Sequence, residues 1–185
     1  MSCIKRLFRW SVCVITLTTA TPLVSASAAG SMLPAAPVGS HHFSVGARFH
    51  QEQPEFKNPS FGDGDMTYLA AYEYHELYGS WQFALGYTPE TDLDETVDYI
   101  LTPEINLIYK ERFYRGGIGM LKDYIKWEDQ SGWRDLYYQF IVGVGFPIMK
   151  MNLNITGYYV FDDWGNIGKF DFGNLEYAAM LRFNF

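Results

Sequence analysis

Charged side chains of both signs recur at alternate positions along several segments of the chain. They are Arg48, Glu73, Glu104, Lys110, Arg115, Asp123, Asp135, Glu176 and Arg182. In a β-strand, alternate positions share one face of the sheet. If that face is enclosed, the charges must pair, because an unpaired buried charge is costly. The nine residues therefore predict either a salt-bridged plug or a path for protons or ions, and we favour the plug.

Acidic residues also gather in the polar segments between these stretches. Asp63 and Asp65 flank a glycine, and Asp92 and Asp94 lie in the acidic run 90–95. Carboxylate oxygens are hard ligands that suit divalent cations. Neither spacing matches an EF-hand loop, so a solvated acidic rim is the alternative. These four aspartates are the candidate metal ligands.

A histidine near a hydroxyl group or an acid is the usual starting point of nucleophilic catalysis. His50 precedes Ser60 and Asp63, whereas His75 lies next to Glu76. No catalytic residue and no cofactor are assigned from these pairs.

Eight runs of period-2 alternation must position these residues. They cover about 41–50, 66–75, 81–87, 97–110, 113–124, 135–146, 151–161 and 175–185. Long polar connections at 51–65, 88–96, 125–134 and 162–173 alternate with short ones. This layout predicts an all-β fold, an eight-stranded antiparallel up-and-down barrel. Pro103 interrupts the fourth run, where it lacks a backbone donor, and predicts a bulge or a split strand there.

Two features indicate that the apolar face of each strand meets lipid and the polar face lines the lumen. Tyr99 and Tyr109 lie ten residues apart on the apolar face. That separation spans about 25 Å in a tilted strand, the height of an outer-membrane apolar band. The polar face is rich in glycine, which leaves room in a narrow interior for side chains such as Arg48 and Arg182. The barrel is therefore predicted to be transmembrane.

The ending GNLEYAAMLRFNF supplies a third feature. Tyr177, Phe183 and Phe185 place aromatic residues at alternating positions up to the last residue. This pattern resembles the C-terminal signature of small bacterial outer-membrane β-barrels. The resemblance implies insertion by the barrel-assembly machinery, with outer-membrane lipid and lipopolysaccharide as surroundings.

A second resemblance concerns the lipid A palmitoyltransferase barrels, whose first strand is similar to Ala47-Arg48-Phe49. The catalytic histidine of that family precedes this triplet, where the present chain has Gly46. Its Asp-Ser pair has no match in TPETDLDET. The histidine-serine pair of lipid A deacylases is also absent from the last strands. A lipid A-modifying enzyme that uses His50 and loop acids therefore remains only an alternative.

The first 28 residues predict a cleaved export signal. Lys5, Arg6 and Arg9 precede an apolar stretch, and Ala26-Ser27-Ala28 forms an A-x-A cleavage pattern. Residues 29–40 then form a periplasmic leader, and 41–185 form the barrel. Both cysteines lie in the signal, which leaves the mature chain without a disulfide.

Removal of the signal takes three of the 14 basic residues, and the remaining 11 face 21 acids, a net charge of −10. Such a chain repels phosphate backbones, so nucleic acid is not an expected partner. The sequence thus predicts a non-enzymatic bacterial outer-membrane barrel with a closed polar lumen. Its acidic loops, with bound divalent cations as one option, would serve surface interaction, adhesion or envelope stability. A narrow pore is the second alternative.

Overall fold

The computed structural model describes residues 38–51, 60–77, 79–89, 91, 97–111, 113–166 and 174–184. The predicted signal and most of the leader lie outside these residues. The eight strands are β1 His41–Phe49, β2 Met66–Glu76, β3 Gly79–Thr88, β4 Val97–Glu111, β5 Tyr114–Trp127, β6 Ser131–Ile148, β7 Met151–Phe161 and β8 Leu175–Asn184. A short 3-10 helix, η1 (Trp164–Asn166), follows β7.

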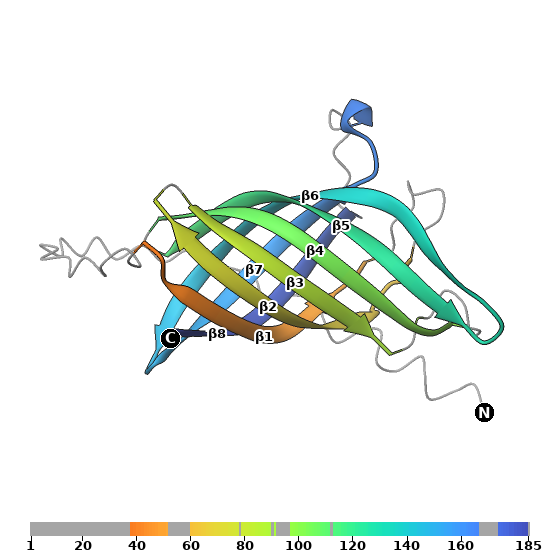
Figure 1. Ribbon diagram of the computed structural model, residues 1–185, viewed down its shortest axis with the longest axis horizontal. Helices are drawn as coiled ribbons and strands as arrows, with labels where there is room; N and C mark the ends of the chain where they lie inside the picture. Colours follow the sequence, from red (N-terminus) through yellow and green to blue (C-terminus); the bar gives the residue numbers. More distant parts are fainter. Residues whose placement is uncertain are drawn as a thin grey trace, which may run out of the picture. The chain divides into compact units, whose positions relative to one another are not determined.

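Every strand pairs antiparallel with its neighbour in sequence, and β8 closes the sheet on β1 (Figure 1). The closing seam runs from the pair His42–Asn184 to the pair Phe49–Tyr177. Because the ladder is closed, the sheet has no edge with unpaired backbone groups. The predicted eight-stranded up-and-down barrel is confirmed.

The two ends of the barrel differ in their connections. The end that carries the β2–β3, β4–β5 and β6–β7 connections is called the short-turn end here, and the opposite end the long-connection end. One predicted long connection, 125–134, is wrong, because β5 and β6 continue to a hairpin at 128–130. Trp127 N donates to Gln130 O at 2.9 Å, and the rings of Tyr124 and Trp133 meet edge-on across the two strands. These contacts extend the β5–β6 pairing into a segment whose polar composition predicted a loop.

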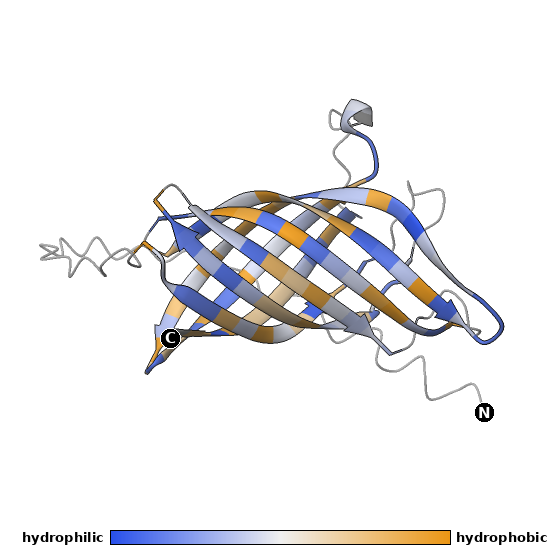
Figure 2. Ribbon diagram, in the orientation of Figure 1, coloured by the Kyte–Doolittle hydropathy of each residue, from blue (hydrophilic) through white to orange (hydrophobic). Residues whose placement is uncertain are grey.

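Hydropathy alternates along the strands (Figure 2), and burial alternates with it between an outer face and an enclosed lumen. In β2, Thr67, Ala71 and Glu73 are buried, whereas Tyr68 and Tyr72 are exposed. Outward apolar side chains on other strands are exposed as well, and Val142 on β6 is 68% exposed. An apolar exterior around a polar interior is the arrangement of a transmembrane barrel, because a water-soluble barrel has the opposite one.

The lumen is not wholly polar. A cluster of inward apolar residues that includes Leu69, Ile108 and Ile141 packs along its wall. At the long-connection end, Phe61 packs against Ile100 and Ile125. This second cluster covers the lumen with apolar side chains at that end.

Pro103 occupies a lipid-facing position within β4 and causes neither of the predicted irregularities. Pairing with β3 continues through Pro103–Leu85. Pairing with β5 lapses between Leu101–Tyr124 and Glu104–Leu121 but resumes in the same register. The missing backbone donor of Pro103 therefore interrupts the β4–β5 pairing locally and causes no bulge there.

A close approach inside the barrel explains one glycine and yields a stability prediction. A methyl group on Gly119 would overlap the Asn106 side chain, with its Cγ atom 2.8 Å away. On Gly116 the nearest atom would be Ile141 O at 3.7 Å, an ordinary contact. We expect Gly119→Ala to lower the free energy of unfolding by about 1–3 kcal/mol through overpacking. Gly116→Ala, the control, should change it by less than about 0.5 kcal/mol. Thermal unfolding in detergent measures both, and equal values would contradict the predicted overlap.

Candidate functional site: a polar network in the lumen

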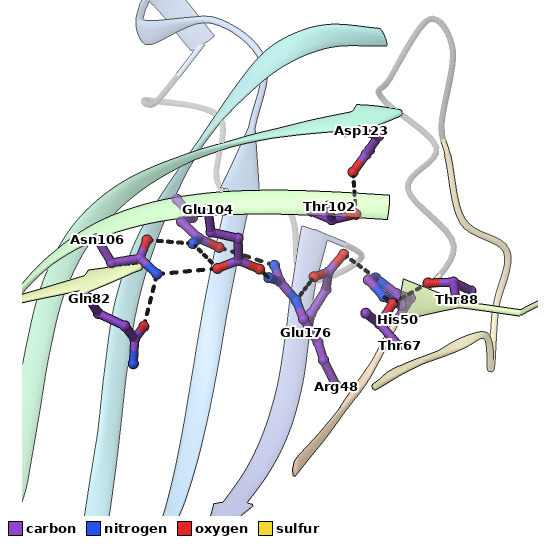
Figure 3. Close-up of polar contacts among 11 residues, drawn as sticks. Arg48, His50, Thr67, Gln82, Thr88, Thr102, Glu104, Asn106, Asp123 and Glu176 are labelled. Atoms are coloured by element: carbon purple, nitrogen blue, oxygen red, sulfur yellow. Dashed lines mark hydrogen bonds and ion pairs between the residues drawn. The ribbon is translucent and has the colours of Figure 1, made fainter. Parts of the chain in front are cut away.

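Arg48 lies at the centre of the lumen and joins four other strands. Its Nε donates to Glu176 on β8, its Nη1 to Glu104 on β4 at 2.8 Å, and its Nη2 to Gln139 on β6 at 3.2 Å (Figure 3). Its guanidinium also lies 4.2 Å from the ring centroid of Tyr158 on β7. Arg48 is only 2% exposed, so its charge depends on these partners rather than on water.

Toward the short-turn end, side-chain amides carry the hydrogen bonds onward. Glu104 accepts from Gln139 at 2.8 Å and from Asn106 at 3.2 Å. Asn106 donates to Gln82 at 2.9 Å, and Gln82 donates to Glu73 at 2.9 Å. Each amide uses both a donor and an acceptor, so it can link two charged groups without adding charge.

Glu73 is the acidic centre of the short-turn half. Arg115 Nη2 lies 2.6 Å from Glu73 Oε1, and Arg182 Nη1 lies 3.6 Å from Glu73 Oε2. Lys110, half-buried at the end of β4, is within electrostatic range of both arginines. Glu73 is thus the carboxylate that pairs with both buried arginines at this end of the lumen, with Lys110 nearby.

Toward the long-connection end, the network passes through a histidine. His50 Nδ1 lies 2.9 Å from Glu176 Oε1, and His50 Nε2 lies 2.6 Å from Thr67 Oγ1. Thr67 is also 2.5 Å from Thr88 Oγ1. Phe61 stacks on the imidazole with its ring centroid 3.7 Å away, and thereby covers the network at this end.

The order of hydroxyl, imidazole and carboxylate at Thr67, His50 and Glu176 is the order found in acyl-transfer enzymes. Here all three groups are buried, and Phe61 covers the histidine. The adjoining cavity has a volume of only about 10 Å³, close to the minimum for one water molecule. An acyl chain therefore has no access to Thr67 in this arrangement.

Asp123 lines that cavity but stands apart from the arginines. It accepts from Thr102 Oγ1 at 2.7 Å. This side-chain bond crosses from β4 to β5 where the backbone pairing lapses beside Pro103. Asp123 and Thr102 thus join the two strands at the site where the ladder does not.

Most of the predicted lumen charges are placed as expected. Arg48, Glu73, Glu104, Arg115, Asp123, Glu176 and Arg182 are buried inside the barrel, and Lys110 is half-buried. Asp135 is the exception, since its side chain is exposed. Lys122 pairs with Leu136 and Tyr124 with Trp133, so one residue of β5 faces two residues of β6. This bulge shifts the alternation by one position and turns Asp135 outward.

The candidate metal ligands lie at the long-connection end. Asp65 is buried, and its carboxylate accepts from Gly62 N at 2.7 Å and from Thr91 Oγ1. Asp63 is exposed in the same turn, where Gly64 has a φ of +91°. Asp92 and Asp94 lie outside the described residues. Within the part of the chain that is described, no group of three or more histidine, cysteine or acidic residues is placed to hold a metal ion.

The structure describes two of the three residues of the predicted assembly signal. Tyr177 is exposed on the outer surface of β8, and Phe183 is half-buried at the seam, paired with Phe43 of β1. Phe185 lies outside the described residues.

Sequence reasoning missed the neutral members of the network. Gln82, Asn106, Gln139, Thr67 and Thr88 lie in the same alternation phase as the charged residues, which is the signal that could have found them. Their partners depend on which strands the closed sheet brings together, and one strand's pattern does not contain that information.

The fold and this interior define a class: a closed eight-stranded transmembrane β-barrel whose lumen is filled by a salt-bridged polar network. No helix among the described residues is long and apolar enough to cross a membrane.

Comparisons with known proteins add little to this class. No protein-family model matches the chain, and no curated protein sequence matches it. Among solved structures, the chain is similar to Ail, the attachment invasion locus protein of Yersinia pestis. The similarity covers 80% of this chain and 100% of that one, with 14% identity and a TM-score of 0.43. At these values the likeness carries no argument, and the fold rests on the chain's own strand pairing.

The central arginine gives a second stability prediction. Arg48→Gln leaves Glu104 and Glu176 buried without their cation, which should lower the free energy of unfolding by about 3–5 kcal/mol. Lys150→Gln removes the same charge from an exposed turn and should change it by less than about 0.5 kcal/mol. Urea unfolding of the refolded barrel, followed by tryptophan fluorescence, measures both. If Arg48→Gln were as stable as Lys150→Gln, the network would not be a structural plug.

Proposed function

We propose that this protein is a non-enzymatic bacterial outer-membrane barrel that acts through its outer surface. The observation that carries the proposal is the closed lumen. Charged and amide side chains fill its centre, and Phe61, Ile100 and Ile125 cover its long-connection end. The cavity beside Arg48, His50 and Glu176 has a volume of about 10 Å³, room for about one water molecule, which favours an interior that acts as a support rather than as a route or a pocket.

The outer surface supports the membrane location. Leu85, Leu107 and Val142 are each more than 40% exposed on neighbouring or nearby strands. Side chains of this kind are stable against lipid and unfavourable against water, at roughly 25 cal/mol per Å² of apolar surface. In barrels of this class the short turns face the periplasm and the longer connections face the exterior. We therefore place the long-connection end outside the cell. The predicted export signal and the C-terminal assembly signal fit this route.

The outward connections carry the proposed role in surface interaction or adhesion. Their sequence is acidic, and part of the β1–β2 connection forms a hydrogen-bonded turn. His50 N donates to Asp65 O at 3.0 Å, and Gly64 N donates to His50 O at 3.1 Å. The barrel thus supports a defined turn at its mouth, as expected of a scaffold that presents a contact surface.

The two alternatives make different demands on the interior. A narrow pore needs a water path past Arg48, and a lipid A-modifying enzyme needs space for an acyl chain next to His50. The cavity that adjoins Arg48 and His50, with a volume of about 10 Å³, is too small for either. Planar-bilayer conductance of the refolded protein and lipid A mass spectra of a deletion strain address these alternatives directly.

The membrane location yields a labelling prediction. Single cysteines at Leu107 and Val142 should resist a water-soluble thiol reagent in intact membranes, because both side chains face lipid. A cysteine at the exposed Asp129, in the β5–β6 hairpin, is the matched control and should react in whole cells. The mature chain is predicted to contain no other cysteine, so the labelling is specific. Rapid labelling at Leu107, or recovery of the protein in the periplasmic fraction, would contradict the proposal.

The role of the connections is tested by replacing 51–59, 89–96 and 162–174 with short linkers, which keeps Phe61 and Asp65 over the lumen. We expect the shortened barrel to insert and to keep its heat-dependent gel mobility, but to lose attachment of the bacteria to host-cell or abiotic surfaces. Complementation of a deletion strain with the full chain should restore attachment. If the shortened barrel restores the deletion phenotype fully, the connections do not carry the function.

A further inference from the structure

Six buried polar atoms in the short-turn half of the lumen have no hydrogen-bond partner among the described residues. They are Arg182 Nε and Nη1, Arg115 Nε, Asn154 Nδ2 and Oδ1, and Ser44 Oγ. Their side chains are only 1–6% exposed, so bulk water does not reach them. Buried polar groups are nearly always paired, and such a concentration of unpaired ones calls for a partner that the chain does not supply. Five of the six atoms can donate, so the missing partner is an acceptor.

Strand pairing brings these side chains to one level of the lumen. Asn154 and Arg182 are diagonal neighbours on β7 and β8, a placement within reach of long side chains. On the other side, Arg115 of β5 faces Gly143 of β6, and Asn154 faces Gly145 of the same strand. Since both β6 positions are glycine, β6 places no side chain between Arg115 and Asn154 there. The unpaired donors therefore converge from several strands.

Positive charge exceeds negative charge at this level. Glu73 is the carboxylate here, and its two oxygens lie 2.6 Å from Arg115 Nη2 and 3.6 Å from Arg182 Nη1. Lys110, half-buried beside Arg115 on the neighbouring strand, adds a third cation. The carboxylates of the central network are bonded to Arg48 instead. Among the described residues of this level, one carboxylate thus faces three cations.

Ordered water is the simplest partner for buried polar groups, and it would fill the missing hydrogen bonds. Two observations favour an anion over water. Water offers as many donors as acceptors, whereas the unpaired atoms here are mostly donors. Water also brings no charge, whereas buried cations require a negative partner. An anion meets both demands, because it only accepts hydrogen bonds and carries the missing charge.

From this arrangement we infer that the short-turn half of the lumen binds a small inorganic anion of the halide class. Arg182, Arg115 and Asn154 donate to it from three strands. Ser44, which pairs with Arg182 across the closing seam, adds a hydroxyl donor. A spherical ion suits donors that arrive from several directions, and the half-buried Lys110 lies at the end through which it enters. The ion completes the polar plug, and the inference goes beyond the proposed function because it depends only on the closed barrel.

The first test measures thermal unfolding of the full barrel, refolded in detergent at constant ionic strength, with chloride replacing gluconate. Chloride at about 0.1 M should raise the Tm of the unaltered chain by about 2–5 °C, because it binds only the folded state. Asn154→Asp supplies the negative charge from the chain itself, so it should raise the Tm in gluconate and remove the chloride dependence. Lys150→Gln makes the same charge change on an exposed turn and should keep that dependence. Arg182→Gln, which removes one donor group and one excess cation, should lose it.

The second test locates the ion directly. Crystals of the unaltered chain grown with bromide should show an anomalous peak within hydrogen-bond distance of Arg182 and Asn154, and crystals of Asn154→Asp should not. Equal Tm values in chloride and gluconate would overturn the inference, with ordered water as the partner if the peak is absent and an adventitious ion only if it is present. A chloride dependence that persists in both Asn154→Asp and Arg182→Gln would also overturn it. Heat-dependent gel mobility checks folding, and loss of the proposed surface role would leave these results unchanged.

Discussion

The structure depends on the neutralisation of Arg48 inside a space that water scarcely enters. A guanidinium in such surroundings is tolerated only when several acceptors reach it with good geometry. Glu104 and Glu176 come from strands far apart in the sequence, so they meet Arg48 only when the sheet is closed. The central ion pairs and the barrel closure therefore require each other. A slip of one register position would turn the charged face of a strand toward lipid.

This constraint also limits where function can reside. An interior whose charges are paired with one another cannot rearrange to admit a substrate without leaving some of them unpaired. The His50–Glu176 contact, which resembles part of a catalytic relay, has a structural explanation, because it extends the Arg48 network to Thr67 and the mouth of the barrel. Chemistry available to partners larger than a small ion is then confined to the outer surface of the strands and to the connections.

The alternation of single strands was sufficient to predict the eight strands and the inward position of residues such as Arg48 and Glu176. It failed where the backbone departs from strict alternation. The bulge in β6 turned Asp135 outward, and the β5–β6 hairpin is tighter than its polar sequence indicated. The hydrogen-bond partners in the lumen could not be predicted either. Gln82 and Asn106 carry no charge to mark them, and their bonds depend on the register between strands, which one strand's sequence does not specify.

Arginine and lysine occupy different environments in this barrel, and their chemistry explains the division. The fully buried lumen cations Arg48, Arg115 and Arg182 are arginines, whereas the lysines are half-buried at the end of the lumen (Lys110) or outward on β5 (Lys122 and Lys126). The planar guanidinium offers five donors and is weakly hydrated, which suits a dry space with several fixed acceptors. The ammonium is strongly hydrated and sits on a flexible stem, which lets it reach the boundary between lipid and water. The guanidinium groups thus stabilise the closed interior, whereas the ammonium groups lie where water can reach them.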